Sequence, residues 1–307
     1  MERAFAVAGR AVVVTGAARG IGLAQAQLLA TCGARVVLVD NGSALSGASG
    51  HTGAAHEAAA AIVAAGGVAV GCAADLSTLA GCEDAIATCI KAYGTIDGLC
   101  HYASPCPDLQ GPDAMRDEDI ALLLAVNPMA AMRLTRAAWS IMRDQGFGRI
   151  VLAPSAALYG AAGNTPYAAS KAALIGVVRC LAVEGFEHGI RVNGVLPAAQ
   201  SRMTEGFLPE PYATWFFERM KPEHVAAGAA WLLSEACDLT GEILAVGGGR
   251  VARMQLAESD GGFASGDDPD AVEAAIRSAM AEQQPESFPR DLAERSARVA
   301  ALFRPAG

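Results

Sequence analysis

The chain has 307 residues, a formal net charge of −9 at pH 7 and a 52% share of apolar residues. This length is long for one ordinary domain and short for two large ones, so we expect one domain with an appendage. The negative charge argues against nucleic acid, because a phosphate backbone calls for clustered basic residues that the sequence lacks. It also lacks a run of about 18 apolar residues, so we expect no membrane span.

The first residues and the cysteines indicate the compartment. An expected strand begins soon after Met1 and leaves no room for a separate signal peptide, so we expect a cytoplasmic protein. The eight cysteines form no CxxC pair and mostly lie in apolar segments, where thiols behave as small apolar side chains. The sequence therefore predicts neither disulfides nor a metal site.

Short β-rich runs alternate with alanine-rich helical stretches along the chain. The expected strands cover residues 11–14, 35–39, 68–71, 98–100, 149–152, 191–196 and 241–246. The expected helices cover about residues 20–32, 54–65, 79–92, 117–144, 166–187 and 222–234. Repeated βαβ units with right-handed crossovers build a doubly wound sheet. We therefore expect an α/β, Rossmann-like fold over residues 1–249, with a seven-stranded parallel sheet and helices on both faces.

Two segments interrupt this alternation. Residues 41–53 are rich in Gly and Ser and are expected to form a mobile loop. Residues 198–220 are expected to form a lid over a substrate. The large apolar side chains of this lid, which could equally be core or subunit contacts, are Phe207, Leu208, Trp215, Phe216 and Phe217.

Residues 250–307 form a C-terminal extension without a strand pattern. A helix is expected to follow a cap at Asp268 to Asp270, and a second helix is expected over residues 289–303. The apolar face of the first helix would hold Val272, Ile276, Ala279 and Met280. We expect this helical extension to pack against the main domain or a subunit partner.

A glycine-rich turn of the form TGxxxGxG, from Thr15 to Gly22, follows the first expected strand. Gly16 permits the tight turn, and Gly20 lets the backbone approach a pyrophosphate. Gly22 lets the next helix pack closely with its first amides toward the phosphates. The turn therefore predicts a dinucleotide site.

Asp40, at the end of the second expected strand, indicates which dinucleotide binds. A carboxylate there can hold the ribose hydroxyls of an adenosine. A 2′-phosphate at ~4 Å would meet like charge, at a cost of about 4 kcal/mol for an effective dielectric constant of ~20. Arg19 in the glycine turn could favour a 2′-phosphate, although solvent or pyrophosphate is its more ordinary partner. We expect NAD rather than NADP.

Ser155, Tyr167 and Lys171 carry the acid–base chemistry. The chain has only three lysines, and one of them lies four residues after a tyrosine. On a helix this spacing places phenol and ammonium on one face, where the ammonium favours the phenolate of a group with a reference pKa near ~10. Beside a nucleotide, the pair predicts proton transfer.

Together these motifs resemble the short-chain dehydrogenase/reductase family over about residues 8–249. The resemblance rests on Thr15 to Gly22, Asp75, Asn127, Ser155, Tyr167, Lys171 and Asn193 to Pro197. It implies that Tyr167 is the general acid/base for an alcohol whose hydride goes to a nicotinamide. Lys171 would lower the phenol pKa and hold the nicotinamide ribose, and Ser155 would orient the substrate oxygen. Asn127 would hold a water that links Lys171 to solvent, unless it merely satisfies backbone groups freed by Pro128.

The resemblance also implies a set of cofactor contacts. Asp75 would meet the adenine amino group with Leu76 against the ring, unless Asp75 is the N-cap of the next helix. Residues from Pro197 would pass over the nicotinamide, and Thr204 would reach its carboxamide. The complete set is Gly16, Arg19, Gly20, Ile21, Gly22, Asp40, Asp75, Leu76, Ala103, Tyr167, Lys171, Pro197 and Thr204.

One segment departs from the family pattern. Where the family usually reads Asn-Asn-Ala-Gly, this chain reads His101-Tyr102-Ala103-Ser104. The hydrogen bonds of the first Asn must therefore come from His101 or be absent. Ser104 replaces a glycine that lets the cofactor ribose approach closely, so we expect the departure to affect cofactor affinity.

Other short sequence segments indicate the substrate class. The loop after Asp40 and the segments 200–204, 220–225 and 246–249 are similar to the dehydrogenase parts of peroxisomal multifunctional enzymes of type 2, whose bacterial relatives include hydroxyacyl-CoA and 17β-hydroxysteroid dehydrogenases. This likeness implies a (3R)-hydroxyacyl-CoA, which could carry a steroid, with a 17β-hydroxysteroid as the alternative. A remote alternative is a non-catalytic nucleotide-binding paralogue. The resemblance also implies a homodimer or homotetramer through the helices at 117–144 and 166–187. Candidates for the CoA phosphates are Arg202, Arg250 and Arg253.

Overall fold

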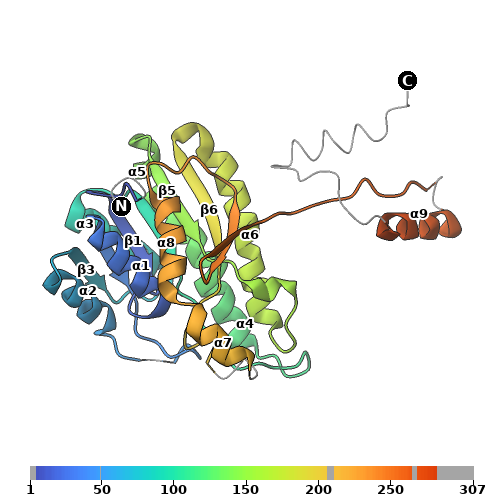
Figure 1. Ribbon diagram of the computed structural model, residues 1–307, viewed down its shortest axis with the longest axis horizontal. Coiled ribbons are helices and arrows are strands. Elements are labelled where there is room, and N and C mark those ends of the chain that lie inside the picture. The colour runs from blue at the N-terminus through green and yellow to red at the C-terminus, as the bar shows by residue number, and fades with distance from the viewer. Residues whose placement is uncertain (1–4, 49, 206–210, 265–267, 282–307) are drawn as a thin grey trace. The chain divides into compact units, whose positions relative to one another are not determined.

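The computed structural model forms two compact units, residues 1–253 and 254–307, and describes residues 5–48, 50–205, 211–264 and 268–281. The first unit holds a parallel sheet with helices on both faces, so the predicted fold class is confirmed (Figure 1).

The sheet has eight strands in the order β3-β2-β1-β4-β5-β6-β7-β8. They are β1 (Ala11–Thr15), β2 (Arg35–Val39), β3 (Val68–Cys72), β4 (Gly98–His101), β5 (Gly148–Leu152), β6 (Ile190–Pro197), β7 (Ile243–Gly247) and β8 (Arg250–Met254). β1 to β7 pair in parallel. The strand order reverses between β1 and β4, and doubly wound sheets bind ligands beyond the carboxyl ends of the strands at such a point.

The eighth strand differs from the seven-stranded prediction. β8 follows β7 after Gly248 and Gly249, whose φ angles of +58° and +81° suit a tight hairpin turn. Neighbouring strands joined by two residues must run antiparallel. Arg253 of β8 donates to the Glu242 carboxylate at 2.6 and 2.7 Å. The largely exposed β8 lacks the buried pattern that marks the central strands, which is why the sequence did not reveal it.

The helices of the first unit begin and end close to their predicted bounds, except for the helix Tyr212–Arg219, which forms within the segment predicted as a lid. They are α1 (Gly20–Thr31), α2 (Ala54–Ala64), α3 (Leu79–Tyr93), α4 (Asp117–Leu124), α5 (Ala130–Asp144), α6 (Thr165–Gly185), α7 (Tyr212–Arg219) and α8 (Pro222–Leu233). The helix predicted over 117–144 is interrupted by a π-helical turn, Ala125–Met129, that contains Pro128. Proline has no amide hydrogen and does not fit a regular α-helix interior, so the wider turn accommodates it.

One crossover has the opposite hand from the others, which corrects the prediction of uniformly right-handed crossovers. α1 and α8 pack together on one face of the sheet, whereas α3, α5 and α6 lie on the other (Figure 1). The steps β5 to β6 and β6 to β7 run in the same direction across the sheet. Because α6 and α8 lie on opposite faces, the two crossovers differ in hand. The connection to β7 is long and includes α7, so it is not a tight βαβ unit.

The loop after β2, residues 41–53, reaches across to the segment that follows β4. The Leu45 carbonyl oxygen accepts a hydrogen bond from the Cys106 amide at 2.7 Å. Gly47 lies against Leu122 of α4, where an added Cβ would come within 2.3 Å of the leucine side chain. The predicted mobility of this loop stays a prediction.

In the second unit, α9 (Pro269–Ala281) forms where the sequence predicts a helix. Asp268 caps it, because its side chain accepts from the Ala271 amide at 3.1 Å. Val272, Ile276 and Met280 are exposed within this unit. The second predicted helix, 289–303, lies outside the described residues, and the partner of the extension stays a prediction.

Candidate active site

The glycine turn joins β1 to α1 with backbone shapes that glycine adopts freely. Gly16 and Gly20 have φ angles of +65° and +53°. A Cβ on Gly22 would lie 2.2 Å from the Gly16 carbonyl oxygen, and one on Gly16 would lie 2.9 Å from the Ala103 amide nitrogen. A Cβ on Gly20 would meet no atom of the described residues within 4 Å. The N-cap residue Arg19 makes no side-chain bond to the first amides of α1, which leaves them available to an anion.

The Asp40 carboxylate lies beside this turn at the end of β2. Its Oδ2 accepts a hydrogen bond from the Ala18 amide at 3.0 Å, and its Oδ1 accepts from the Gly42 amide at 2.8 Å. These two bonds fix the orientation of the carboxylate relative to the phosphate turn. Arg19 is exposed. The arrangement places a negative charge next to the predicted adenosine ribose.

Asp75 and Leu76 follow β3. The Asp75 side chain is exposed and accepts from the Ser77 amide at 3.0 Å, while Leu76 is buried. Thr78, not Asp75, caps α3, because its hydroxyl accepts from the Gly81 amide at 3.0 Å. The alternative of Asp75 as N-cap is therefore wrong.

His101, at the carboxyl end of β4, supplies hydrogen bonds in the departing segment. Its Nδ1 lies 2.8 Å from Thr15 Oγ1, and its Nε2 lies 2.9 Å from the Val126 carbonyl oxygen. Burial lowers the pKa of this fully buried ring to about 4, and the nearby Lys171 acts in the same direction. The Ser104 hydroxyl donates to the Pro105 carbonyl oxygen at 3.0 Å.

The acid–base residues come from two places in the fold: the carboxyl end of β5 and the first two turns of α6. Ser155 follows β5, and its Oγ accepts from the Ala157 amide at 3.2 Å. Tyr167 and Lys171 share one face of α6, with Lys171 Nζ 5.9 Å from the centre of the Tyr167 ring. Lys171 Nζ donates to the Ala153 carbonyl oxygen at 3.0 Å. The three side chains that the sequence singled out therefore lie together.

The pKa of Tyr167 is raised, whereas the prediction was that the neighbouring Lys171 ammonium lowers it. Desolvation raises the pKa of Tyr167 to about 12, although part of the side chain remains exposed, and a hydrogen bond with Ser155 offsets only part of this increase. Burial lowers the pKa of Lys171 to about 7. The protein alone therefore does not meet the prediction that Lys171 lowers the phenol pKa, because the buried ammonium itself loses its proton near neutrality.

Asn127 lies in the π-helical turn and is fully buried. Its Nδ2 donates to Ser170 Oγ at 2.9 Å, and that hydroxyl donates to the Tyr167 carbonyl oxygen at 2.8 Å. Within the described part of the chain, Asn127 Oδ1 has no hydrogen-bond partner. The side chain thus does not serve the backbone near Pro128. A buried amide oxygen without a protein partner fits a bound water.

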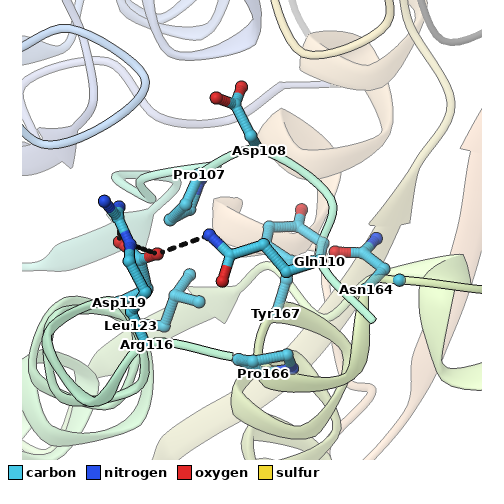
Figure 2. Close-up of a pocket in the computed structure, with 10 residues that line it drawn as sticks. Pro107, Asp108, Gln110, Arg116, Asp119, Leu123, Asn164, Pro166 and Tyr167 are labelled. Carbon is cyan, nitrogen blue, oxygen red and sulfur yellow. Dashed lines mark hydrogen bonds and ion pairs between the residues drawn. The ribbon is translucent and has the colours of Figure 1, made fainter. Parts of the chain in front are cut away.

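A small cavity of about 20 Å³ lies beside Tyr167, large enough for about one water. Figure 2 shows Asp119 bonded to Arg116 and Gln110 at this cavity. Asp119 accepts from Arg116 Nε and Nη2, both at 2.8 Å, and from Gln110 Nε2 at 3.1 Å. The hydrogen bonds from Arg116 lower the pKa of Asp119.

The sequence missed several of these residues. Gln110, Arg116 and Asp119 belong to no motif, and Ser170 was overlooked although it precedes Lys171. Cys106 lies near both Tyr167 and Lys171, and its position between two prolines gave no signal in the sequence. Their roles follow from chain segments that meet only in the fold.

The end of β6 and the segment after it hold the residues that are predicted to contact the nicotinamide. Pro197 ends β6, and the Thr204 hydroxyl bonds locally to Ser201, donating to its carbonyl oxygen and accepting from its amide, both at 2.9 Å. In α7, Phe216 is buried and Trp215 is exposed. Phe207 and Leu208 lie outside the described residues. Among the described residues no group of His, Cys, Asp and Glu is placed to hold a metal ion.

Comparison with known proteins defines the class. A family model described as Enoyl-(Acyl carrier protein) reductase matches residues 16–250. The chain belongs to the short-chain dehydrogenase/reductase family, whose dehydrogenases act on CH–OH groups.

Two curated relatives share about a third of their residues with this chain. Peroxisomal multifunctional enzyme type 2 of Mus musculus is 35% identical over 248 residues, which are 80% of this chain and 33% of that enzyme. A short-chain type dehydrogenase/reductase of Mycobacterium tuberculosis is 35% identical over 268 residues, 87% of this chain and 91% of the relative. The chain therefore spans about a third of the mouse enzyme's length and nearly all of the mycobacterial one.

Solved structures agree with this placement. A short chain dehydrogenase from Mycobacterium avium superposes with a TM-score of 0.78 at 30% identity, over 92% of this chain and 99% of that one. A 7α-hydroxysteroid dehydrogenase complexed with NADH and 7-oxo glycochenodeoxycholic acid gives 0.72 at 27% identity, over 82% and 98%. A short chain dehydrogenase from Burkholderia cenocepacia in complex with NADP gives 0.68 at 31% identity, over 80% and 98%. Structural neighbours thus bind either nicotinamide dinucleotide.

Proposed function

We propose that the protein is an NAD-dependent dehydrogenase that interconverts a secondary alcohol and a ketone, with a (3R)-hydroxyacyl-CoA as its substrate class. The observation that carries this proposal is the meeting of Ser155, Tyr167 and Lys171 at the edge of the sheet where the glycine turn lies. The catalytic and cofactor-binding roles expected from the sequence are part of the proposal.

Each residue of the group has a distinct role in alcohol oxidation. Tyr167 acts as the phenolate, whose Oη takes the hydroxyl proton, and Ser155 Oγ holds the substrate oxygen. Because the protein alone raises the pKa of Tyr167 to about 12, this role requires the positive charge that the oxidised cofactor would bring. When bound, NAD would accept the hydride from the alcohol carbon. Lys171 holds the nicotinamide ribose, and its proton reaches solvent through a water on Asn127 Oδ1. The unpartnered buried amide oxygen supports this last role.

The proposed preference for NAD rests on Asp40. Its carboxylate is held by two backbone amides, so it cannot easily turn away from a 2′-phosphate. We expect kcat/KM with NAD to exceed that with NADP by at least about tenfold, and Asp40→Ser to reduce the ratio. Initial rates with both cofactors test this. Equal or faster rates with NADP would overturn the proposal.

The relatives support the substrate class. The mouse relative is a peroxisomal multifunctional enzyme, and this chain matches one third of it. The steroid-bound neighbour favours the second candidate, a hydroxysteroid. For the CoA phosphates, Arg253 is already paired with Glu242, whereas Arg202 and Arg250 are exposed.

An assay of NADH formation with 3-hydroxyacyl-CoAs of both configurations and with 17β-hydroxysteroids separates these candidates. We expect the (3R)-acyl-CoAs to react fastest, and Tyr167→Phe to abolish turnover while NAD binding by calorimetry stays nearly unchanged. NAD binding without turnover of any alcohol would instead favour the non-catalytic paralogue. The cytoplasmic location and the absence of metal, nucleic-acid and membrane partners stay predictions.

A further inference from the structure

His101 occupies a position between two parts of the site that are far apart in sequence. Through Thr15 it touches the end of β1, from which the glycine turn leaves, and through Val126 it touches the turn that carries Asn127. The ring is fully buried. A buried polar ring must satisfy both of its nitrogens.

The hydrogen bonds determine where the ring proton lies. A carbonyl oxygen only accepts, so Nε2 must donate to the Val126 oxygen at 2.9 Å. A neutral imidazole has one N–H, so Nδ1 must accept from the Thr15 hydroxyl at 2.8 Å. The two lone pairs of Thr15 Oγ1 then accept from the Tyr102 and Ala103 amides at 3.1 and 3.2 Å.

With this assignment, every hydrogen-bond donor and acceptor of the His101 ring and the Thr15 hydroxyl has a partner. A doubly protonated ring would direct a third donor at Thr15 Oγ1, which can accept only two. It would also add a positive charge near Lys171 of α6, the charged group among the described residues that acts on the ring. The geometry therefore requires the neutral ring.

We propose that His101 is a positioning residue whose neutral, Nε2-protonated ring couples the cofactor turn to the π-helical turn of Asn127. It holds the Val126 carbonyl on one side and, through Thr15, the Ala103 amide that packs against Gly16 on the other. The kinetic part of this proposal rests on the proposed dehydrogenase function. The assignment of the ring proton does not.

The first test observes the ring directly. In ¹⁵N-histidine-labelled protein, the His101 signal is identified by its loss in His101→Asn, since the chain has five histidines. We expect a proton on Nε2, a bare Nδ1 and no titration from pH 8 down to about pH 5.5. A proton on Nδ1, or titration near the ordinary histidine value, overturns the proposal. This readout requires no activity, so it stands even if the dehydrogenase assignment fails.

The second test separates positioning from stability. His101→Leu removes both bonds, whereas His101→Asn restores one donor and one acceptor and is the residue that the family usually has here. We expect His101→Leu to lower kcat and raise the KM for NAD by about five- to tenfold each, with recovery to within about twofold in His101→Asn. Rates are measured well below the melting temperature of each variant. A folded His101→Leu with unchanged kcat and KM overturns the proposal, and a variant that does not fold leaves the decision to the ring spectrum.

Discussion

Lys171 lies at the proposed catalytic site, and the burial of its ammonium destabilises the fold. It is 3% exposed, and its ammonium finds one carbonyl oxygen, that of Ala153. Among the described residues no carboxylate acts on it, and burial lowers its pKa to about 7. Burying a charge with so little compensation destabilises a fold, and such groups are retained where the chemistry needs them. The ligand-free protein should therefore be more stable without this lysine.

We predict that Lys171→Met abolishes turnover but raises the free energy of unfolding at pH 7 by about 2 kcal/mol, after the lost bond to Ala153 is allowed for. Between pH 7 and 10.5 the unfolded chain binds a proton that folded Lys171 does not, so wild-type stability rises with pH in this window. The advantage of Lys171→Met should shrink accordingly. Chemical denaturation without cofactor at pH 7 and pH 9 measures both values.

The exposed Lys91 provides the control for this prediction. Lys91→Met should change stability by less than about 0.5 kcal/mol at either pH. A Lys171→Met protein that is less stable than wild type at pH 7 would show that the buried ammonium is well compensated.

His101 contributes to the pH dependence of stability with the same sign as Lys171, but in a lower pH window. Its folded pKa of about 4 lies below the ordinary 6.5, so its share of stability is present above pH 6.5 and is lost as the pH falls toward 4. The shift corresponds to about 3 kcal/mol. His101→Asn should therefore flatten the acid side of the stability profile, and an equally steep profile in this variant would contradict the shift.

At the scale of the element, two glycines of the glycine turn differ in why a side chain is excluded. Gly22 is required by the packing of the fold, and Gly20 borders the space proposed for the cofactor phosphates. A Cβ on Gly22 would lie 2.2 Å from the Gly16 carbonyl oxygen, whereas one on Gly20 would have no atom of the described chain within 4 Å. We predict that Gly22→Ala costs about 3 kcal/mol of stability. Gly20→Ala should cost about 1 kcal/mol for its left-handed backbone and weaken NAD binding at least about tenfold.

Thermal unfolding and calorimetric titration with NAD check the two glycine variants together. Gly20→Ala should be the more stable of the two variants and should nevertheless bind NAD poorly. Wild-type affinity in Gly20→Ala would show that the open space beside Gly20 is not the phosphate site.

The sequence predicted most elements to within two residues because buried strands and alanine-rich helices carry strong patterns. It did not reveal the hand of the α8 crossover, since handedness depends on which face α8 covers. The π-helical turn was also missed, although Pro128 marked the disturbance. Motif spacing identified Ser155, Tyr167 and Lys171, but not their partners: Ser170 and Cys106 approach them only in the folded chain.

At the scale of the whole molecule, two helical stretches carry apolar surface that the described residues of the first unit leave uncovered. The stretches Asp117–Asp144 and Thr165–His188 are apolar and long enough to cross a bilayer by composition and length, yet only 39% and 28% of their apolar windows are buried. Core helices of globular proteins pass the same test. Met132 and Val183 on these stretches are 48% and 57% exposed. We propose that this surface meets a second copy of the chain.

We predict a dimer or tetramer in solution, and a shift toward the monomer in the double variant Met132→Glu/Val183→Glu, because two charges would be buried without partners. Size-exclusion chromatography with light scattering measures the mass. Val63→Glu, on α2 at a comparable 51% exposure, is the matched control and should leave the mass unchanged. A monomeric wild type at micromolar concentration would refute the prediction.

The loop of residues 41–53 connects the proposed nucleotide site with the proposed alcohol site. One end begins at Asp40, whose carboxylate holds the Gly42 amide, and its middle is bonded to Cys106 beside the acid–base residues. In the proposed dehydrogenase, a nucleotide that shifts the loop at the Asp40 end would also alter its contact with Cys106 at the alcohol end. Reciprocity then requires that the factor by which the nucleotide changes alcohol affinity equals the factor by which the alcohol changes nucleotide affinity.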